Sequence, residues 1–300
     1  MIKYIGFNSA IPSQIQKLFD YYLNFNKNYL IIGPWIKSEQ ISSLKNDNFD
    51  IKIIIIYEPI FNSKIYDDIR FPHLREFVTN YKTYKNMYLF GCVENNPEEK
   101  KIKFPLYMIH TFPIYEKPNI YFTKANNFIK NTDILSKNFC CLINRWDPNN
   151  HRTKMHNILS KIKNIHCPSN LLNNCSNNEL NQVGKPTYIS NFLFNICSEN
   201  TDNTYKGYIT EKLMDCCLGG AIPIYTGWFD EYDAKIFNKN RIIFYNSNDE
   251  SSYEKVYNQV KELIENKEKL NTFYRQPIFC DTANETIEKL KKNFKLIRNT

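Results

Sequence analysis

Short apolar runs alternate with amphipathic stretches along most of the chain, a pattern that predicts parallel strands covered by helices. The run at 50–57 is almost entirely isoleucine, which is typical of a strand buried on both faces. In this first part of the chain the pattern predicts strands at 2–8, 29–33, 50–57 and 86–93, and helices at 13–24 and 65–82.

A stretch that contains several prolines, residues 94–137, breaks the alternation and predicts a linker. Beyond it, the pattern predicts strands at 139–145, 192–198, 221–226 and 241–245, and helices at 151–163, 208–218, 251–266 and 283–298. The expected fold class is α/β, with two Rossmann-like domains facing across a cleft. We expect the domains at 1–130 and 131–275, and a C-terminal helix at 276–300 that packs back on the body.

Charge and hydrophobicity change this picture little. The net charge of +8 is spread along the chain in short basic runs, which are typical of solvated helix faces, so we expect no nucleic-acid partner. A positive chain is nevertheless compatible with a diphosphate ligand. No apolar run is long enough to span a bilayer, and residues 1–11 lack a signal-peptide pattern. We therefore expect a soluble protein without a transmembrane anchor.

The spacing of cysteine and histidine argues against disulfides and metal. The nine cysteines include the adjacent pairs Cys140–Cys141 and Cys216–Cys217, and no C-x-x-C motif is present. Reduced, buried thiols and a cytoplasmic location are the simplest interpretation. The five histidines follow no metal-binding spacing, so we expect no metal site.

Glycine is scarce in this chain, and half of its eight residues lie between 207 and 227. The pair Gly219–Gly220 follows a predicted helix and is best explained as a helix end. Two others, Gly207 and Gly227, flank polar segments and fit either a turn or the close approach of backbone to a ligand.

The same region runs from a strand through a polar loop into a helix start, an arrangement that presents backbone N–H groups to an anion. Lys212 in the first helical turn opposes the helix dipole, but it would be favourable beside a diphosphate. Glu211 suits the dipole and could also accept hydrogen bonds from sugar hydroxyls. Taken alone, this pattern favours ordinary residues of a solvated helix start for both side chains.

Several short motifs in this region resemble the donor-binding signature of the α-1,3/4-fucosyltransferases, glycosyltransferase family ten. They are Cys197-Ser-Glu-Asn200, Gly207-Tyr-Ile-Thr-Glu-Lys212 and Ile222-Pro-Ile-Tyr-Thr-Gly227. Upstream segments resemble other parts of that family: Asn138-Phe-Cys-Cys-Leu-Ile-Asn144 with Arg152, Cys167-Pro-Ser169 and Asn173-Asn174; Lys103-Phe-Pro-Leu-Tyr107; and Ile54-Ile-Ile-Tyr-Glu58-Pro59. The resemblance is firm over about 138–245 and weak before 86.

This resemblance implies a GT-B arrangement, with an acceptor-side first domain and a nucleotide-sugar second domain. It also implies GDP-β-L-fucose as donor, a glycan acceptor, inversion at the anomeric carbon and no required cofactor or metal. Arg152 and Lys212 would hold the diphosphate at the cleft, and Glu211 would contact the sugar. The donor-binding set implied is Asn144, Arg152, Glu199, Asn200, Tyr208, Thr210, Glu211 and Lys212.

The resemblance makes Glu58 the general base that takes the acceptor proton, with Glu94, Asp67 and Asp68 as rivals. The expected linkage is α-1,3 or α-1,4 to N-acetylglucosamine or glucose. Two alternatives stay open. The chain could be a GT-B transferase that uses another nucleotide sugar, or a non-catalytic protein that binds carbohydrate or nucleic acid.

Overall fold

The computed structural model describes residues 1–7, 13–23, 26–44, 48–57, 73–111 and 117–298. The contacts divide the chain into two compact units. Unit 1 comprises Met1–Glu116, Tyr205–Thr210 and Ile287–Thr300, and unit 2 comprises Lys117–Thr204 and Glu211–Thr286. A short piece of the polar loop before Glu211 and most of the last helix are therefore part of unit 1.

The core of unit 1 is a five-stranded sheet in the order β1-β2-β3-β4-β5, in which every neighbouring pair is parallel. The isoleucine run forms β3, and all six of its residues are buried, as predicted. The elements of this unit are β1 (Ile2–Ile5), α1 (Ser13–Tyr22), β2 (Tyr29–Ile32), α2 (Ser38–Ser43), β3 (Ile51–Ile56), α3 (Leu74–Thr79), β4 (Met87–Gly91), β5 (Lys101–Lys103), α4 (Tyr107–His110) and, in most of its length, α13 (Ala283–Arg298).

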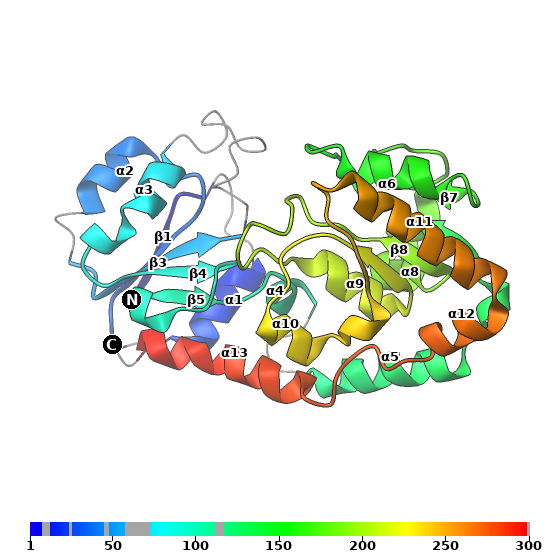
Figure 1. Cartoon of the computed structure of the whole chain (residues 1–300). Helices are drawn as coiled ribbons and strands as arrows, with labels where there is room; N and C mark the ends of the chain where they lie inside the picture. Colours follow the sequence, from blue (N-terminus) through cyan, green and yellow to red (C-terminus); the bar gives the residue numbers. More distant parts are fainter. Residues whose placement is uncertain (8–12, 24–25, 45–47, 58–72, 112–116, 299–300) are drawn as a thin grey trace. The chain divides into compact units, whose positions relative to one another are not determined.

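Helices cover both faces of this sheet, with α2 and α3 on one side and α1 and α13 on the other (Figure 1). Alternate residues of β3 and β4 supply the two cores, as the two-residue period of a strand requires. Ile54 and Leu89 pack toward α3 with Phe77. On the opposite face, Phe90 packs against Phe294 of α13, with ring centroids 4.8 Å apart.

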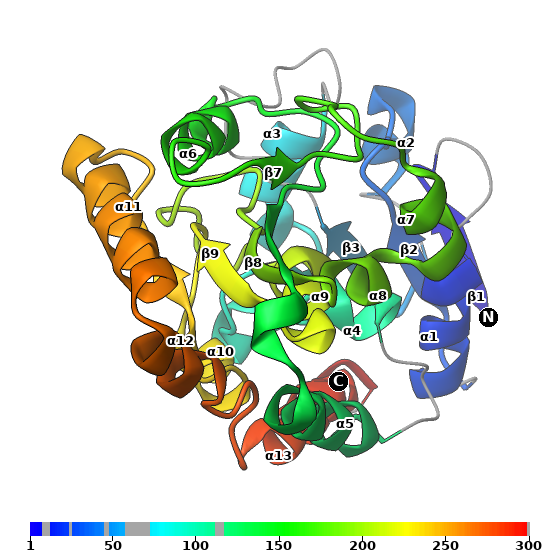
Figure 2. The ribbon, with the colours of Figure 1, turned by 90° about the vertical axis from the view of Figure 1, so that its right-hand side faces the viewer.

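Unit 2 contains a second parallel five-stranded sheet, in the order β10-β9-β8-β6-β7. Two of its helices, α11 and α12, follow one another along one side (Figure 2). The elements are α5 (Asn119–Asn131), β6 (Asn138–Cys141), α6 (His151–Leu159), β7 (Ile165–His166), α7 (Asn178–Val183), α8 (Lys185–Ile189), β8 (Phe192–Ile196), α9 (Glu211–Gly219), β9 (Ile222–Tyr225), α10 (Glu231–Ile236), β10 (Ile243–Phe244), α11 (Glu250–Glu265) and α12 (Lys267–Tyr274).

A buried arginine joins two helix ends in unit 2. The Arg241 guanidinium donates hydrogen bonds to the carbonyl oxygens of Gly220 and Ala221, each at 2.8 Å, just after α9. It also donates to the Tyr274 carbonyl at the end of α12, at 3.0 Å. Terminal helix carbonyls lack partners within their own helix, so a cation satisfies both their hydrogen bonds and the negative end of the dipole.

The prediction of a linker over 94–137 is wrong, because this stretch contains β5, α4 and α5. The strand β5 has only three residues and was too short to give a pattern. In α5 the buried residues Phe122, Ala125 and Ile129 do follow helical spacing, so the signal was present but hidden by nearby prolines. The predicted helix at 208–218 instead begins at Glu211, and the predicted strand at 241–245 is reduced to Ile243–Phe244.

Candidate functional site

Polar residues follow the ends of two neighbouring strands of unit 2, β6 and β8. Ligands of parallel α/β sheets bind at this edge. Here the two segments border a cavity of about 560 Å³. Its lining includes predicted donor-binding residues from both segments and from the start of α9: Asn144, Arg152, Asn200 and Lys212.

The charged residues of the cavity lining are cationic among the residues that the structure describes. They are Arg145, Arg152, Lys185 and Lys212, and no described aspartate or glutamate belongs to the lining. The remaining lining residues are mostly uncharged polar side chains, among them Ser169, Asn170, Asn177 and Asn181. A cavity with this lining attracts an anion and offers amide groups to its uncharged parts.

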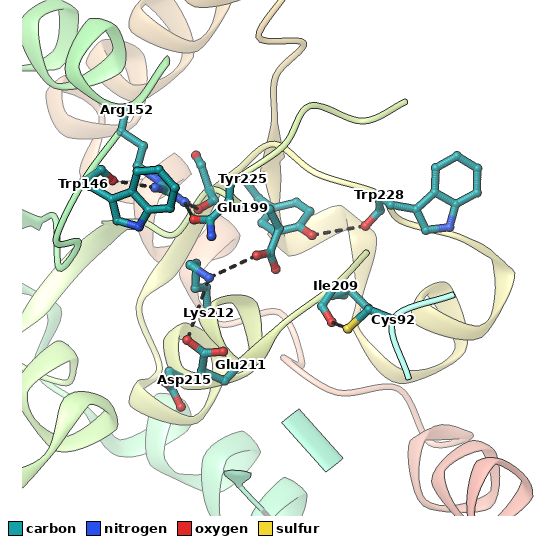
Figure 3. Close-up of polar contacts among 12 residues, drawn as sticks. Cys92, Trp146, Arg152, Glu199, Ile209, Glu211, Lys212, Asp215, Tyr225 and Trp228 are labelled. Atoms are coloured by element: carbon teal, nitrogen blue, oxygen red, sulfur yellow. Dashed lines mark hydrogen bonds and ion pairs between the residues drawn. The ribbon is translucent and has the colours of Figure 1, made fainter. Parts of the chain in front are cut away.

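Lys212 is held between two carboxylates. Its Nζ lies 3.3 Å from Glu199 Oε2 and 3.8 Å from Glu211 Oε1, and both ion pairs are drawn in Figure 3. Burial alone would lower the pKa of Lys212, but the two carboxylates outweigh burial and raise it. Lys212 therefore stays cationic. The Glu199 side chain is fully buried, so it supports the lysine from behind the cavity.

Gly227, which follows β9, packs closely against the Glu199 side chain. Gly227 has a φ of +152°, and a Cβ atom at this position would lie 2.7 Å from Glu199 Cγ and 2.6 Å from Tyr225 Oη. Any side chain would displace the carboxylate that holds Lys212. The structure thus shows Gly227 packed against Glu199 and Tyr225, and it does not test a close approach of its backbone to a ligand.

Arg152 is fully buried, which differs from the expected position at an open cleft. Its guanidinium donates to the Ser198 carbonyl at 2.7 and 3.2 Å, to the Trp146 carbonyl at 2.9 Å and to Asn200 Oδ1 at 2.8 Å. The side chain thus ties the segment after β6 to the loop after β8 (Figure 3). It lines the cavity and also stabilises the cavity wall.

A buried histidine, His151, also stabilises the cavity wall. His151 Nε2 lies 2.9 Å from the Glu199 carbonyl and, because a carbonyl only accepts, this nitrogen carries the proton. Burial, and next the Arg152 charge, lower the pKa of His151 to about 4. The imidazole is therefore neutral at physiological pH. Next to it, the Ser198 and Tyr245 hydroxyls are hydrogen-bonded at 2.7 Å.

Four predicted donor-binding residues are not in the cavity lining. Glu199 lies behind Lys212, Glu211 directly precedes Lys212 and is paired with it, and Tyr208 and Thr210 are buried within the segment 205–210 of unit 1. That segment is fixed by a contact at Gly207, where a Cβ atom would lie 2.1 Å from the Val93 carbonyl carbon. The Cys92 thiol donates to the Ile209 carbonyl at 3.2 Å (Figure 3). This packing explains why α9 begins later than predicted.

The candidate bases are mostly outside the described residues. Glu58, Asp67 and Asp68 all lie in the stretch 58–72, which the structure does not describe. Glu94 is described, and its carboxylate lies 3.6 Å from Lys206 Nζ within unit 1. Nearly half of the Glu94 side chain is exposed, as is typical of a surface ion pair.

The structure adds residues to the site that the sequence did not indicate. Arg145 and Trp146 line the cavity after β6, and Lys185 at the start of α8 lines it from another side. Asp215 lies one turn after Glu211 on α9, a helical spacing that could have identified it. The pKa of Asp215 is raised to about 7, mainly by burial and also by the Glu211 carboxylate, against the lowering effect of Lys185 and Lys212.

In the part of the chain that the structure describes, no group of three or more His, Cys, Asp and Glu side chains is arranged to hold a metal ion. No described helix combines the length and the apolar character needed to cross a membrane.

Residues 134–292 match the model of the family described as "Glycosyltransferase family 10 (fucosyltransferase) C-term". Two curated relatives are similar over shorter stretches. The alpha-(1,3)-fucosyltransferase FucT of Helicobacter pylori is 33% identical over 99 residues, which are 33% of this chain and 20% of that protein. The 4-galactosyl-N-acetylglucosaminide 3-alpha-L-fucosyltransferase 9 of Cricetulus griseus is 34% identical over 103 residues, covering 34% and 27% of the two chains. The match thus spans about a quarter or less of each relative.

Solved structures extend the likeness to the whole fold. A crystal structure of an alpha1,3-fucosyltransferase superposes with a TM-score of 0.64 at 16% identity, covering 100% of this chain and 90% of the other. A structure of such an enzyme with GDP-fucose gives a TM-score of 0.56 at 17% identity, covering 91% and 90%. At these identities the likeness defines the fold, which is of the predicted GT-B type.

Proposed function

This chain belongs to glycosyltransferase family 10, and from that premise we propose that it transfers L-fucose from GDP-β-L-fucose to a hydroxyl of a glycan. The observation that carries this proposal is the cavity beside β6, β8 and α9, whose charged lining residues are all cationic. A nucleoside diphosphate is an anion of suitable chemistry for it. A solved relative with the same fold has been crystallised with GDP-fucose, which supports the choice of donor.

The proposed reaction breaks the bond between the fucose anomeric carbon and the β-phosphate oxygen. The acceptor hydroxyl oxygen forms a bond to the same carbon from the opposite face, so the configuration inverts. The hydroxyl proton passes to a carboxylate base, and GDP leaves with the electron pair of the broken bond. Negative charge therefore builds up on the diphosphate, where fixed cations stabilise the transition state more than the bound donor.

Lys212 and Arg152 are the cations we assign to this role. Lys212 is positioned by Glu199 at 3.3 Å, so it is oriented before the donor arrives. Arg152 is fixed by neutral oxygen acceptors, including Asn200 Oδ1 at 2.8 Å. The amide of Asn144 and the other polar lining residues are available to the nucleoside. We keep Glu211 as a ligand for sugar hydroxyls, and Glu58 as the proposed base.

The proposal extends to the linkage and the location of the protein. We propose an α-1,3 or α-1,4 linkage to N-acetylglucosamine or glucose. The names of the relatives support the α-1,3 linkage and, for one of them, an N-acetylglucosaminide acceptor. A cytoplasmic location is proposed because all nine cysteines are free thiols and most are buried, as suits a reducing compartment. No metal is assigned a role.

A binding panel tests the donor. We expect GDP-fucose and GDP to raise the melting temperature of the protein, and UDP- and CMP-sugars to leave it unchanged. Incubation with GDP-fucose and a small glycan array, read by NMR, should then give a fucosylated product with an α linkage. Lys212→Met should lower the transfer rate by about 100- to 1,000-fold, because one cation that stabilises the negative charge on the leaving GDP is lost.

The alternative hypothesis, a transferase that uses another nucleotide sugar, predicts a different result in the same binding panel. If a uridine or cytidine sugar stabilises the protein and GDP-fucose does not, the chain is a GT-B transferase with another donor. Binding of glycan without any transfer, for every nucleotide sugar tested, would instead identify a non-catalytic lectin.

A further inference from the structure

Lys185 is a cation of the cavity lining to which neither the family motifs nor the sequence pattern assigned a role. It opens the short helix α8, and the side chain is about 45% exposed. It lines the 560 Å³ cavity together with Lys212, and it also lines a smaller neighbouring cavity that contains Lys212 and Asp215. Lys185 is therefore placed at the cavity surface.

Lys185 and Lys212 share one carboxylate oxygen. The Nζ of Lys185 lies 3.7 Å from Glu211 Oε1, and the Nζ of Lys212 lies 3.8 Å from that same atom. The two ammonium groups are thus near enough to each other for one diphosphate to contact both. A diphosphate carries charge on both phosphoryl groups, so two adjacent lysines match it better than one.

The ion pairs of Lys185 are long and partly exposed. Its second partner, Asp215 Oδ2, is 4.0 Å away, and exposed pairs of this length contribute little free energy. Burial raises the pKa of Asp215 to about 7, so near neutral pH this partner is often uncharged. The flexible lysine stem can consequently move from the carboxylates to a phosphate at small cost.

We propose that Lys185 is a third cation of the donor site, which rests near Glu211 and Asp215 in the free protein and contacts the diphosphate in the complex. This inference rests on the proposed function. The movement of the Lys185 side chain has a second effect. When Lys185 leaves Glu211, the Glu211 carboxylate can accept hydrogen bonds from sugar hydroxyls. Lys185 then stabilises the charge that develops on GDP as the glycosidic bond breaks.

Calorimetric titration of the full chain with GDP, GMP and guanosine tests this proposal. We expect Lys185→Met to raise the Kd for GDP about tenfold, because a charge-assisted bond to phosphate is lost. The Kd for guanosine should change less than twofold, since guanosine has no phosphate. Lys185→Arg should restore most of the GDP affinity.

The matched control is Lys261→Met on α11, because Lys261 is similarly exposed and pairs with Glu265 at 3.9 Å. It should bind all three ligands like the wild type. If Lys185→Met fails to fold, Lys185→Gln replaces it in the same titrations. GDP affinity within twofold of the wild type overturns the proposal, and so does an equal loss for guanosine, which indicates a structural role. A wild-type protein that binds neither GDP nor guanosine overturns the proposed function as well.

Discussion

The two sheets have the same strand number and the same parallel direction, yet they bury different kinds of residue. In unit 1 the described strands bury almost only apolar side chains, with Lys52 and Lys103 as charged exceptions. In unit 2 a buried polar set surrounds the strand ends: Asn144, His151, Arg152, Asn195, Ser198, Glu199, Thr201 and Thr226. Burying such polar groups costs free energy of folding unless each group is hydrogen-bonded. We therefore expect unit 2 to tolerate fewer amino-acid substitutions at these positions.

The largest effect on transfer should come from replacing Arg152, the buried cation of the cavity wall in unit 2, by an apolar residue of similar length. Arg152→Met removes hydrogen bonds to Ser198, Trp146 and Asn200 and leaves their oxygens unsatisfied. We expect transfer to fall at least about 1,000-fold and the free energy of unfolding to fall by about 3 kcal/mol. Urea denaturation and a transfer assay measure the two effects. Normal stability with lost transfer would mean that the hydrogen bonds of Arg152 contribute nothing to the wall.

The next effect concerns the pH dependence of stability. Asp215 has a folded pKa of about 7, above its unfolded value of about 3.9, so the native state binds its proton more tightly. Its contribution is fully present below about pH 4 and is lost as the pH rises to about 7.

An asparagine does not ionise, so Asp215→Asn removes the loss of stability that accompanies ionisation of Asp215. The variant should therefore gain stability relative to the wild type as the pH rises from 4 to 7, by up to about 4 kcal/mol, and the difference should be constant above that range. Urea midpoints at several pH values measure it. His151, whose pKa is lowered to about 4, acts in the opposite direction, so the variant-minus-wild-type difference is the quantity to compare. A difference independent of pH would show that Asp215 is ionised like an exposed aspartate.

The smallest effect on stability should come from substituting a buried aromatic residue of unit 1 by a smaller apolar residue. Phe294 packs among Phe19, Phe90 and Phe104 with centroids 4.8–5.7 Å apart. Phe294→Leu keeps an apolar side chain of comparable size, so we expect a loss of about 1 kcal/mol in the free energy of unfolding. Affinity for GDP should be unchanged. A loss as large as that of Arg152→Met would remove the contrast between the two units.

The sequence predicted the sheets because a buried parallel strand is a short, continuous apolar run. The isoleucines of β3 and the apolar run of β8 are examples that need no tertiary context. The motifs around Asn144, Asn200 and Lys212 likewise predicted residues that the structure brings to one cavity.

The rest depends on contacts that a local pattern does not contain. The start of α9 is set by the packing of Gly207 against Val93, which is more than 100 residues away in the chain. Burial of Arg152 depends on the loop after β8, and the role of Lys185 depends on α8 lying beside α9. Helix α8 has only five residues, too few for a periodic pattern of apolar positions to show in the sequence.

The arginine at the far end of α9 has a consequence for how variants of this protein are interpreted. Arg241 anchors the carbonyls after α9, while Lys212 stands in the first turn of the same helix. A nine-residue helix is a stiff rod, so a shift at its anchored end is transmitted to the ammonium group at the other. Loss of activity after a change at Arg241 would then indicate that α9 has shifted and displaced the Lys212 ammonium group. It would not indicate that Arg241 is itself a catalytic group.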